Sequence, residues 1–248
     1  MNVVDSVTCV LRPDLWMYTP STTSRAQEVI QLLKQSKCPL LLGIWGMPGI
    51  GKSTIAKAIY EQIDPYFEGK CFLKVGDVWE QNHGQVSLQK KIILDIDKAT
   101  EIEIPTIESG REILKERLRH KRVLLVLDDV NKLEQLNALC RSREWFGAGS
   151  KITITTKDRQ LLNEHGVDHI YRVKELDESE SLAVFNLGAF SQETTPGEDF
   201  GKLSRQLVAY CGRLPLALEK LGSFFNGHEA LQWDGVLRSP EGFSIPVQ

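Results

Sequence analysis

The residues with the clearest chemical potential form one glycine-rich segment. It reads Gly46, Met47, Pro48, Gly49, Ile50, Gly51, Lys52, Ser53 and Thr54, and its first eight positions match G-x-x-x-x-G-K-[ST] in full. Gly49 and Gly51 let the backbone wrap closely, so that its N–H groups can converge on a polyphosphate. Lys52 would reach the β- and γ-phosphates, and the Ser53 hydroxyl would hold Mg²⁺. The segment predicts a phosphate-binding loop (P-loop) for a nucleotide, with all nine residues in the binding site.

A pair of carboxylates supplies the second chemical element. The apolar run Val123–Leu127 is followed directly by Asp128 and Asp129. Two acids at the tip of a buried strand are costly unless a cation or a hydrogen-bond network receives them. We expect Asp128 in the Mg²⁺ shell, through water, and Asp129 as the catalytic candidate that orients or deprotonates an attacking water. The alternative for Asp129 is that it caps the next turn or helix.

The elements around these residues supply the setting that a P-loop needs. Residues 40–45 form an apolar run without alternation, as in a strand buried on both faces, and a helix is expected directly after the loop, at 53–63. Further strands are predicted at 71–75, 123–127, 151–155 and 169–173, and further helices at 24–37, 86–96, 107–120 and 133–139. This alternation predicts an α/β fold, a P-loop NTPase parallel sheet with helices on both faces.

The pattern changes near residue 175, after which only helices are predicted, at 176–190, 200–210 and 214–225. We therefore expect three parts. Residues 1–23 are a leader or a remnant of an upstream segment, 24–175 are the nucleotide-binding domain, and 176–248 are a small all-helical subdomain that is incomplete at its C-terminus. His165 and His169 are four residues apart, but Gly166 argues against a helix there, so we expect solvent-exposed or loop histidines rather than a metal pair.

Composition excludes several classes of protein. The 248 residues carry a net charge of −3, which gives no drive toward nucleic acid or an anionic membrane. The five cysteines are scattered and odd in number, as is typical of reduced thiols. Neither a secretory signal nor a membrane-spanning stretch is predicted. We expect a cytoplasmic or nuclear protein that binds adenine nucleotide, with Mg²⁺.

The motifs, taken in order, resemble the NB-ARC domain of plant disease resistance proteins, of the class with an N-terminal TIR domain. The resemblance extends from about Ser24 to about Leu237. It rests on the blocks GIWGMPGIGKSTIAKAIY, CFLKVGDVWEQNHGQVSLQKKIILDI, KRVLLVLDDVNKLEQLNAL, GAGSKITITTKDRQLL and CGRLPLALEKLGS. Asp129 closes the kinase motif within the third of these blocks, which resembles the TIR class.

The resemblance implies a signalling switch in innate immunity, with a resting ADP form and an active ATP form. It implies that Lys157 stands where an arginine senses the γ-phosphate, and that Pro215 packs near the nucleotide. It also implies other immune-receptor chains or domains as partners. Lys157 and Arg213 depart from the family's arginine and glycine, and a lysine lacks the planar fork of an arginine. Two alternatives stay open, a slow P-loop ATPase and a truncated nucleotide binder that does not switch.

Overall fold

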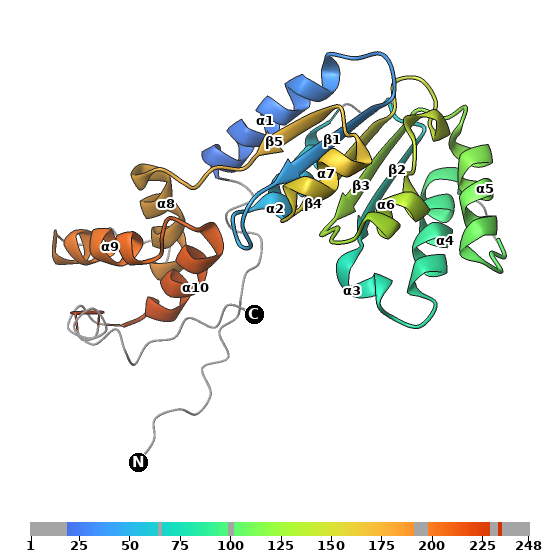
Figure 1. The fold of residues 1–248 in the computed structure, drawn as a ribbon. Coiled ribbons are helices and arrows are strands. Elements are labelled where there is room, and N and C mark those ends of the chain that lie inside the picture. Colours follow the sequence, from blue (N-terminus) through green and yellow to red (C-terminus); the bar gives the residue numbers. More distant parts are fainter. Residues whose placement is uncertain (1–18, 64–65, 99–101, 191–197, 229–232, 235–248) are drawn as a thin grey trace. The chain divides into compact units, whose positions relative to one another are not determined.

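The computed structural model describes residues 19–63, 66–98, 102–190, 198–228 and 233–234 (Figure 1). Of the leader predicted at residues 1–23, residues 1–18 lie outside the described residues. The chain divides into two compact units. Among the described residues, the larger, α/β unit contains those from Thr22 to Pro48 and from Lys52 to Val173. The smaller, helical unit contains 19–21, Gly49–Gly51 and those from Lys174 onward.

Five parallel strands form the sheet of the α/β unit, in the order β2-β3-β4-β1-β5. Their bounds are β1 Leu40–Trp45, β2 Gly69–Lys74, β3 Val123–Asp128, β4 Lys151–Thr156 and β5 His169–Arg172. β1 and β3 are almost wholly buried, which explains why their sequences are apolar without alternation. β4 is buried as well, although its sequence alternates isoleucine with threonine. The prediction of an α/β fold with a parallel sheet is confirmed.

Each face of the sheet has its own helices. On one face, Leu41, Leu125 and Ile154 pack into a core shared with helices α4 (Gly84–Asp97), α5 (Ile107–Leu118), α6 (Leu133–Leu139) and α7 (Arg159–His165). Gly43 lies on the same face, where an added Cβ would lie 2.5 Å from the Leu162 side chain of α7. Helix α2 (Lys52–Gln62) also packs on β1, β3 and β4, but its buried residues are not part of this core, so it covers the opposite face.

The helices of this unit are α1 Pro20–Lys34, α2 Lys52–Gln62, α3 Gly76–Trp79, α4 Gly84–Asp97, α5 Ile107–Leu118, α6 Leu133–Leu139 and α7 Arg159–His165, with a 3₁₀ turn at Arg143–Trp145. Of these, α2, α4, α5 and α6 begin and end close to their predicted bounds, whereas the sequence predicts neither α3 nor α7. Helix α5 begins with a capping box between Thr106 and Ser109. Within the described residues, no helix has the length and apolarity that crossing a bilayer requires.

Two sequence expectations are wrong in this unit. Helix α1 begins at Pro20 rather than Ser24, because proline fits the first turn of a helix and the serines and threonines after it are tolerated there. His165 is the last residue of α7 and not a loop residue, since Gly166 ends the helix with φ +74°. The His165 ring is half-buried with its Nε2 3.8 Å from the Cys140 Sγ, and burial lowers the pKa of this histidine.

The helical unit contains α8 Glu178–Ala189, α9 Glu198–Tyr210 and α10 Pro215–Phe225. Gly188 and Gly222 allow α8 and α10 to pack closely, because a Cβ on Gly222 would lie 2.4 Å from the Phe185 carbonyl oxygen. Trp233 is buried in this core, against the rings of Phe185 and Phe225. The unit therefore has a core of its own.

Candidate functional site

The P-loop connects β1 to α2, as the sequence predicts. Gly49 and Gly51 have φ angles of +74° and +100°, which residues other than glycine rarely adopt. Ile50 is buried and anchors the loop, whereas Met47 is 51% exposed. Ser53 and Thr54 are half-buried in the first turn of α2, next to Lys52. The loop backbone therefore leads directly into the N-terminus of a helix, which favours anions.

Lys52 lies at the centre of the candidate site. Its Nζ donates to the carbonyl oxygens of Gly46 and Met47 at 3.0 and 2.9 Å. Burial lowers the pKa of Lys52, the charges of Asp129 and Asp128 oppose that effect, and the charge of Lys157 adds to it. The structure therefore brings Lys52, both carboxylates and Lys157 into one electrostatic neighbourhood.

Asp128 ends β3 and is only 3% exposed. Its Oδ1 accepts a hydrogen bond of 2.6 Å from the Thr155 hydroxyl on β4. Within the described ranges, no basic side chain forms an ion pair with Asp128. A buried carboxylate that has only a neutral donor fits the prediction of a Mg²⁺ ligand, because such a charge needs a cation.

Asp129 is exposed and has an unusual backbone conformation, with φ +59°. Its N–H donates to the Thr155 Oγ1 at 2.9 Å. A Cβ on Gly76 would lie 2.7 Å from the Asp129 Oδ2, so a larger residue there would displace this carboxylate. Asp129 does not cap the next helix, because Lys132 is the N-cap of α6, while the alternative that Asp129 caps a turn stays open. A strained residue beside the P-loop lysine is consistent with a functional carboxylate.

Lys157 and Pro215 lie in different units. Lys157 is exposed and directly follows β4. Pro215 is buried as the first residue of α10, in the helical unit. Within that unit, the N–H of the next residue, Leu216, donates to the Gly49 carbonyl oxygen at 3.2 Å. The predicted roles of Lys157 and Pro215 in nucleotide binding remain predictions.

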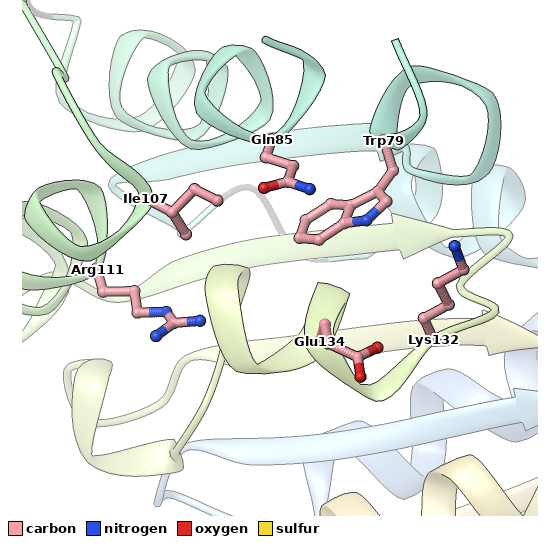
Figure 2. A pocket seen from close by; sticks show the side chains of 6 residues that line it. All are labelled: Trp79, Gln85, Ile107, Arg111, Lys132 and Glu134. Atoms are coloured by element: carbon pink, nitrogen blue, oxygen red, sulfur yellow. The ribbon is translucent and has the colours of Figure 1, made fainter. Parts of the chain in front are cut away.

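A separate hollow of about 460 Å³ lies between α3, α4, α5 and α6 (Figure 2). Its lining consists of Trp79, Gln85, Ile107, Arg111, Lys132 and Glu134. The Lys132 Nζ forms an ion pair of 2.6 Å with Glu80, and oppositely charged Arg111 and Glu134 face the same space. None of the predicted site residues lines it, so it supplies nothing to the P-loop chemistry.

Sequence reasoning misses Thr155 and Gly76. Thr155 is predicted in a strand because its side chain is β-branched, which gives no sign of a polar role. The available signal is its position near the carboxyl end of a parallel strand. Asp128 ends a neighbouring strand and the P-loop follows another, and the carboxyl ends of such strands form one edge of the sheet.

Comparison with solved structures shows the same fold at low sequence identity. Cdc6p of Pyrobaculum aerophilum matches with a TM-score of 0.60 and 16% identity, over 87% of this chain and 63% of that one. The ORC2 protein of Aeropyrum pernix matches with a TM-score of 0.54 and 12% identity, over 92% of this chain and 65% of that one. These likenesses support the fold class alone.

Comparison with curated proteins finds plant disease resistance proteins. TMV resistance protein N of Nicotiana glutinosa is 39% identical over 206 residues, which is 79% of this chain and 17% of the relative. Disease resistance protein RUN1 of Vitis rotundifolia is 37% identical over 217 residues, or 87% of this chain and 16% of the relative. The chain thus spans about a sixth of the length of these relatives.

The sequence profile of the NB-ARC domain matches residues 22–195. This range holds the P-loop, the Asp128–Asp129 pair and the whole sheet. With the fold, the motif order and the resistance-protein relatives in agreement, the chain belongs to the NB-ARC family, as a nucleotide-binding module of the kind found in plant disease resistance proteins.

Proposed function

We propose that this chain is an adenine-nucleotide-dependent signalling switch, resting with ADP and active with ATP, in a plant disease resistance protein. The observation that carries the proposal is the neighbourhood of Lys52. A P-loop lysine, a buried carboxylate with no ion pair among the described residues and a second carboxylate on a strained turn meet at one edge of the sheet. The relatives are disease resistance proteins, which gives the proposed biological setting.

In this proposal, the backbone of Gly46–Thr54 and the Lys52 ammonium bind the phosphates. Lys52 already has acceptors in two loop carbonyls, so its charge is held close to the loop backbone. The Ser53 hydroxyl and Asp128 would hold Mg²⁺, which neutralises phosphate charge when bound. Asp128 is suited to this because Thr155 fixes one of its oxygens.

The switch itself would depend on reading the γ-phosphate. Lys157 lies near enough to Lys52 for its charge to lower the pKa of that lysine. The γ-phosphate of ATP would attract the ammonium groups of both lysines. With ADP there is no γ-phosphate, so the repulsion between the two lysines is not offset. Lys157 would therefore distinguish the two nucleotides by charge alone, without the bidentate geometry of an arginine. Pro215 is proposed to contact the nucleotide, and other receptor chains or domains are the proposed partners.

Identification of the bound nucleotide tests the proposal. Chain purified without added nucleotide is denatured by heat, and the released ligand is identified by chromatography. Retained ADP is the expected result. Absence of any adenine nucleotide, together with no binding on titration, would overturn the proposal.

Lys52→Ala is expected to abolish retention, because the phosphates lose their buried cation. Lys115→Ala, which removes an exposed lysine from α5, is the matched control and should retain ADP. Equal retention by both variants would contradict the site assignment.

A slow ATPase is the second candidate, and the position of Asp129 near Lys52 is the observation that favours it. Release of phosphate by the purified chain separates the two functions. A switch would turn over ATP rarely, so the nucleotide remains bound between events. Sustained turnover of many ATP per minute, lost in Asp129→Asn, would favour the enzyme.

A further inference from the structure

Thr155 occupies a special place in the sheet. It is the penultimate residue of β4, which lies between β3 and β1, the strands that lead to Asp128 and to the P-loop. In register, Thr155 is paired with Ile44 of β1, and its neighbour Ile154 is paired with Leu127 of β3. Its side chain has no exposed surface.

The hydroxyl of Thr155 makes two hydrogen bonds that converge on the acidic pair. It donates to the Asp128 Oδ1 at 2.6 Å and accepts from the Asp129 N–H at 2.9 Å. A third bond joins the main chains, from the Val130 N–H to the Thr155 carbonyl oxygen at 2.9 Å. A threonine has a single O–H donor, so this donor is committed to Asp128.

These bonds couple two features that are otherwise independent. One is the orientation of the buried Asp128 carboxylate, and the other is the backbone of Asp129 at φ +59°. Because the hydroxyl proton is donated to Asp128 Oδ1, it does not occupy the other oxygen, Oδ2, which stays available to a cation. The same hydroxyl holds the turn on which the Asp129 carboxylate is carried.

We propose that Thr155 is a positioning residue for the metal ion, one that orients Asp128 toward Mg²⁺ and fixes the turn of Asp129. This inference rests on the proposed nucleotide-binding function and assigns a role that neither the P-loop nor the acidic pair explains. Groups that hold a metal ligand in place commonly change metal affinity by about 10- to 100-fold when removed.

The chain offers a close control two residues earlier on the same strand. Thr153 is also fully buried, and side-chain alternation puts it on the same face as Thr155. Within the described part of the chain, its Oγ1 has no hydrogen-bond partner. Replacing either threonine with valine removes one hydroxyl at nearly constant volume, but only Thr155→Val removes a contact to Asp128.

The test uses Mn²⁺ as the probe, because it accepts the same oxygen ligands as Mg²⁺ and the free ion has a readily measured electron paramagnetic resonance signal. Free Mn²⁺ is titrated against the full chain with ADP, for the wild type, Thr155→Val, Thr155→Ser and Thr153→Val. ADP affinity is measured in parallel in EDTA, where no divalent ion contributes.

The expected result is that Thr155→Val weakens Mn²⁺ binding by about tenfold or more, with ADP affinity in EDTA unchanged. Thr155→Ser, which keeps the hydroxyl, should bind Mn²⁺ as the wild type does, and so should Thr153→Val. Equal Mn²⁺ affinity in Thr155→Val and the wild type would overturn the inference. So would an equal loss of ADP affinity with and without the metal, which indicates a purely structural role.

Two further arms keep the test decisive. If Thr155→Val does not fold, Thr155→Ala and Thr155→Ser replace it as a pair that differs by one oxygen atom, with the same expectations. If the wild type binds no ADP, the proposed function itself fails. If the wild type binds ADP and Mn²⁺ but Thr155→Val binds Mn²⁺ with the same affinity as the wild type, the role of Thr155 is refuted and the proposed function is not.

Discussion

Two buried or partly buried carboxylates of the α/β unit differ in how their charge is compensated. Asp97 ends α4, its side chain is 12% exposed, and it pairs with Arg117 at 3.0 Å and with Lys121. Asp128 is only 3% exposed, yet its hydrogen bond comes from the neutral Thr155 hydroxyl. The more deeply buried charge thus has the weaker compensation. On this difference rests the proposal that Asp97 stabilises the fold, whereas Asp128 binds a cation.

Asp128→Asn should give the largest effect and tests one side of this comparison. We expect the affinity for nucleotide in the presence of Mg²⁺ to fall by about 10- to 100-fold, because an amide lacks the negative charge of the metal ligand. The affinity without Mg²⁺ should change little. The free energy of unfolding should be equal or higher, because a buried carboxylate without an ion pair among the described residues has been removed. Nucleotide titration with and without Mg²⁺ and urea unfolding measure the two quantities. A large fall in the free energy of unfolding would show that Asp128, like Asp97, stabilises the fold.

Asp97→Asn tests the other side. The free energy of unfolding should fall by about 1.5 kcal/mol. The value is modest because Arg117 and Lys121 are partly exposed and solvent screens their charges. Nucleotide affinity should not change. Urea unfolding at neutral pH measures the difference, and a change in affinity without a change in stability would reverse the assignment.

The pH dependence of the same variant sharpens the comparison. The hydrogen bond from Lys121, with help from Arg117, lowers the pKa of Asp97. A carboxyl group with a lowered pKa contributes stability above its unfolded pKa of about 4, and this contribution is lost as the pH falls through the folded pKa. The stability difference between the wild type and Asp97→Asn should therefore shrink below about pH 4. A stability difference that does not change with pH would contradict a stabilising role of the ion pairs of Asp97.

The backbone offers a parallel comparison, since Asp129 and Arg213 share a φ of +59°. Aspartate tolerates this region better than arginine does. Arg213→Gly should therefore raise the free energy of unfolding of the helical unit by about 1 kcal/mol, with no change in nucleotide affinity. Thermal unfolding measures the effect, and a destabilised variant would show that the Arg213 side chain contributes more than its backbone costs.

Asp129→Gly should give the smallest change in stability, an increase of about 0.5 kcal/mol. Unlike Arg213→Gly, it should slow ATP hydrolysis, because the carboxylate is lost. Single-turnover hydrolysis and thermal unfolding measure the two quantities. Unchanged hydrolysis would remove Asp129 from the site and leave its strained turn without a function.

Long apolar patterns in the sequence predict the fold well. Strand β1 has the predicted bounds, Leu40–Trp45, and so has α6, Leu133–Leu139. The P-loop is recognisable because glycine, lysine and serine are each required at fixed spacing. The order of the strands is not predictable in this way, because β4 pairs with both β1 and β3 through contacts that no local pattern records.

Short elements and shared hydrogen bonds are beyond the sequence. Helix α3, Gly76–Trp79, is a single turn, too short to show a helical period. Gly166 argues against a helix when only the sequence is considered, although it ends α7 directly after His165. The role of Thr155 depends on Asp128 and Asp129, which are 27 and 26 residues away along the chain.

The central claim is that the edge of the sheet formed by the P-loop and Asp128 binds an adenine nucleotide together with a metal ion. Calorimetric titration of ADP into nucleotide-free chain, with Mg²⁺ and then with EDTA, tests it most directly. We predict binding at one site per chain that is tighter with Mg²⁺. Absence of binding in both conditions would contradict the claim for the whole site, and equal affinity in both would contradict the assignment of Asp128 to the metal.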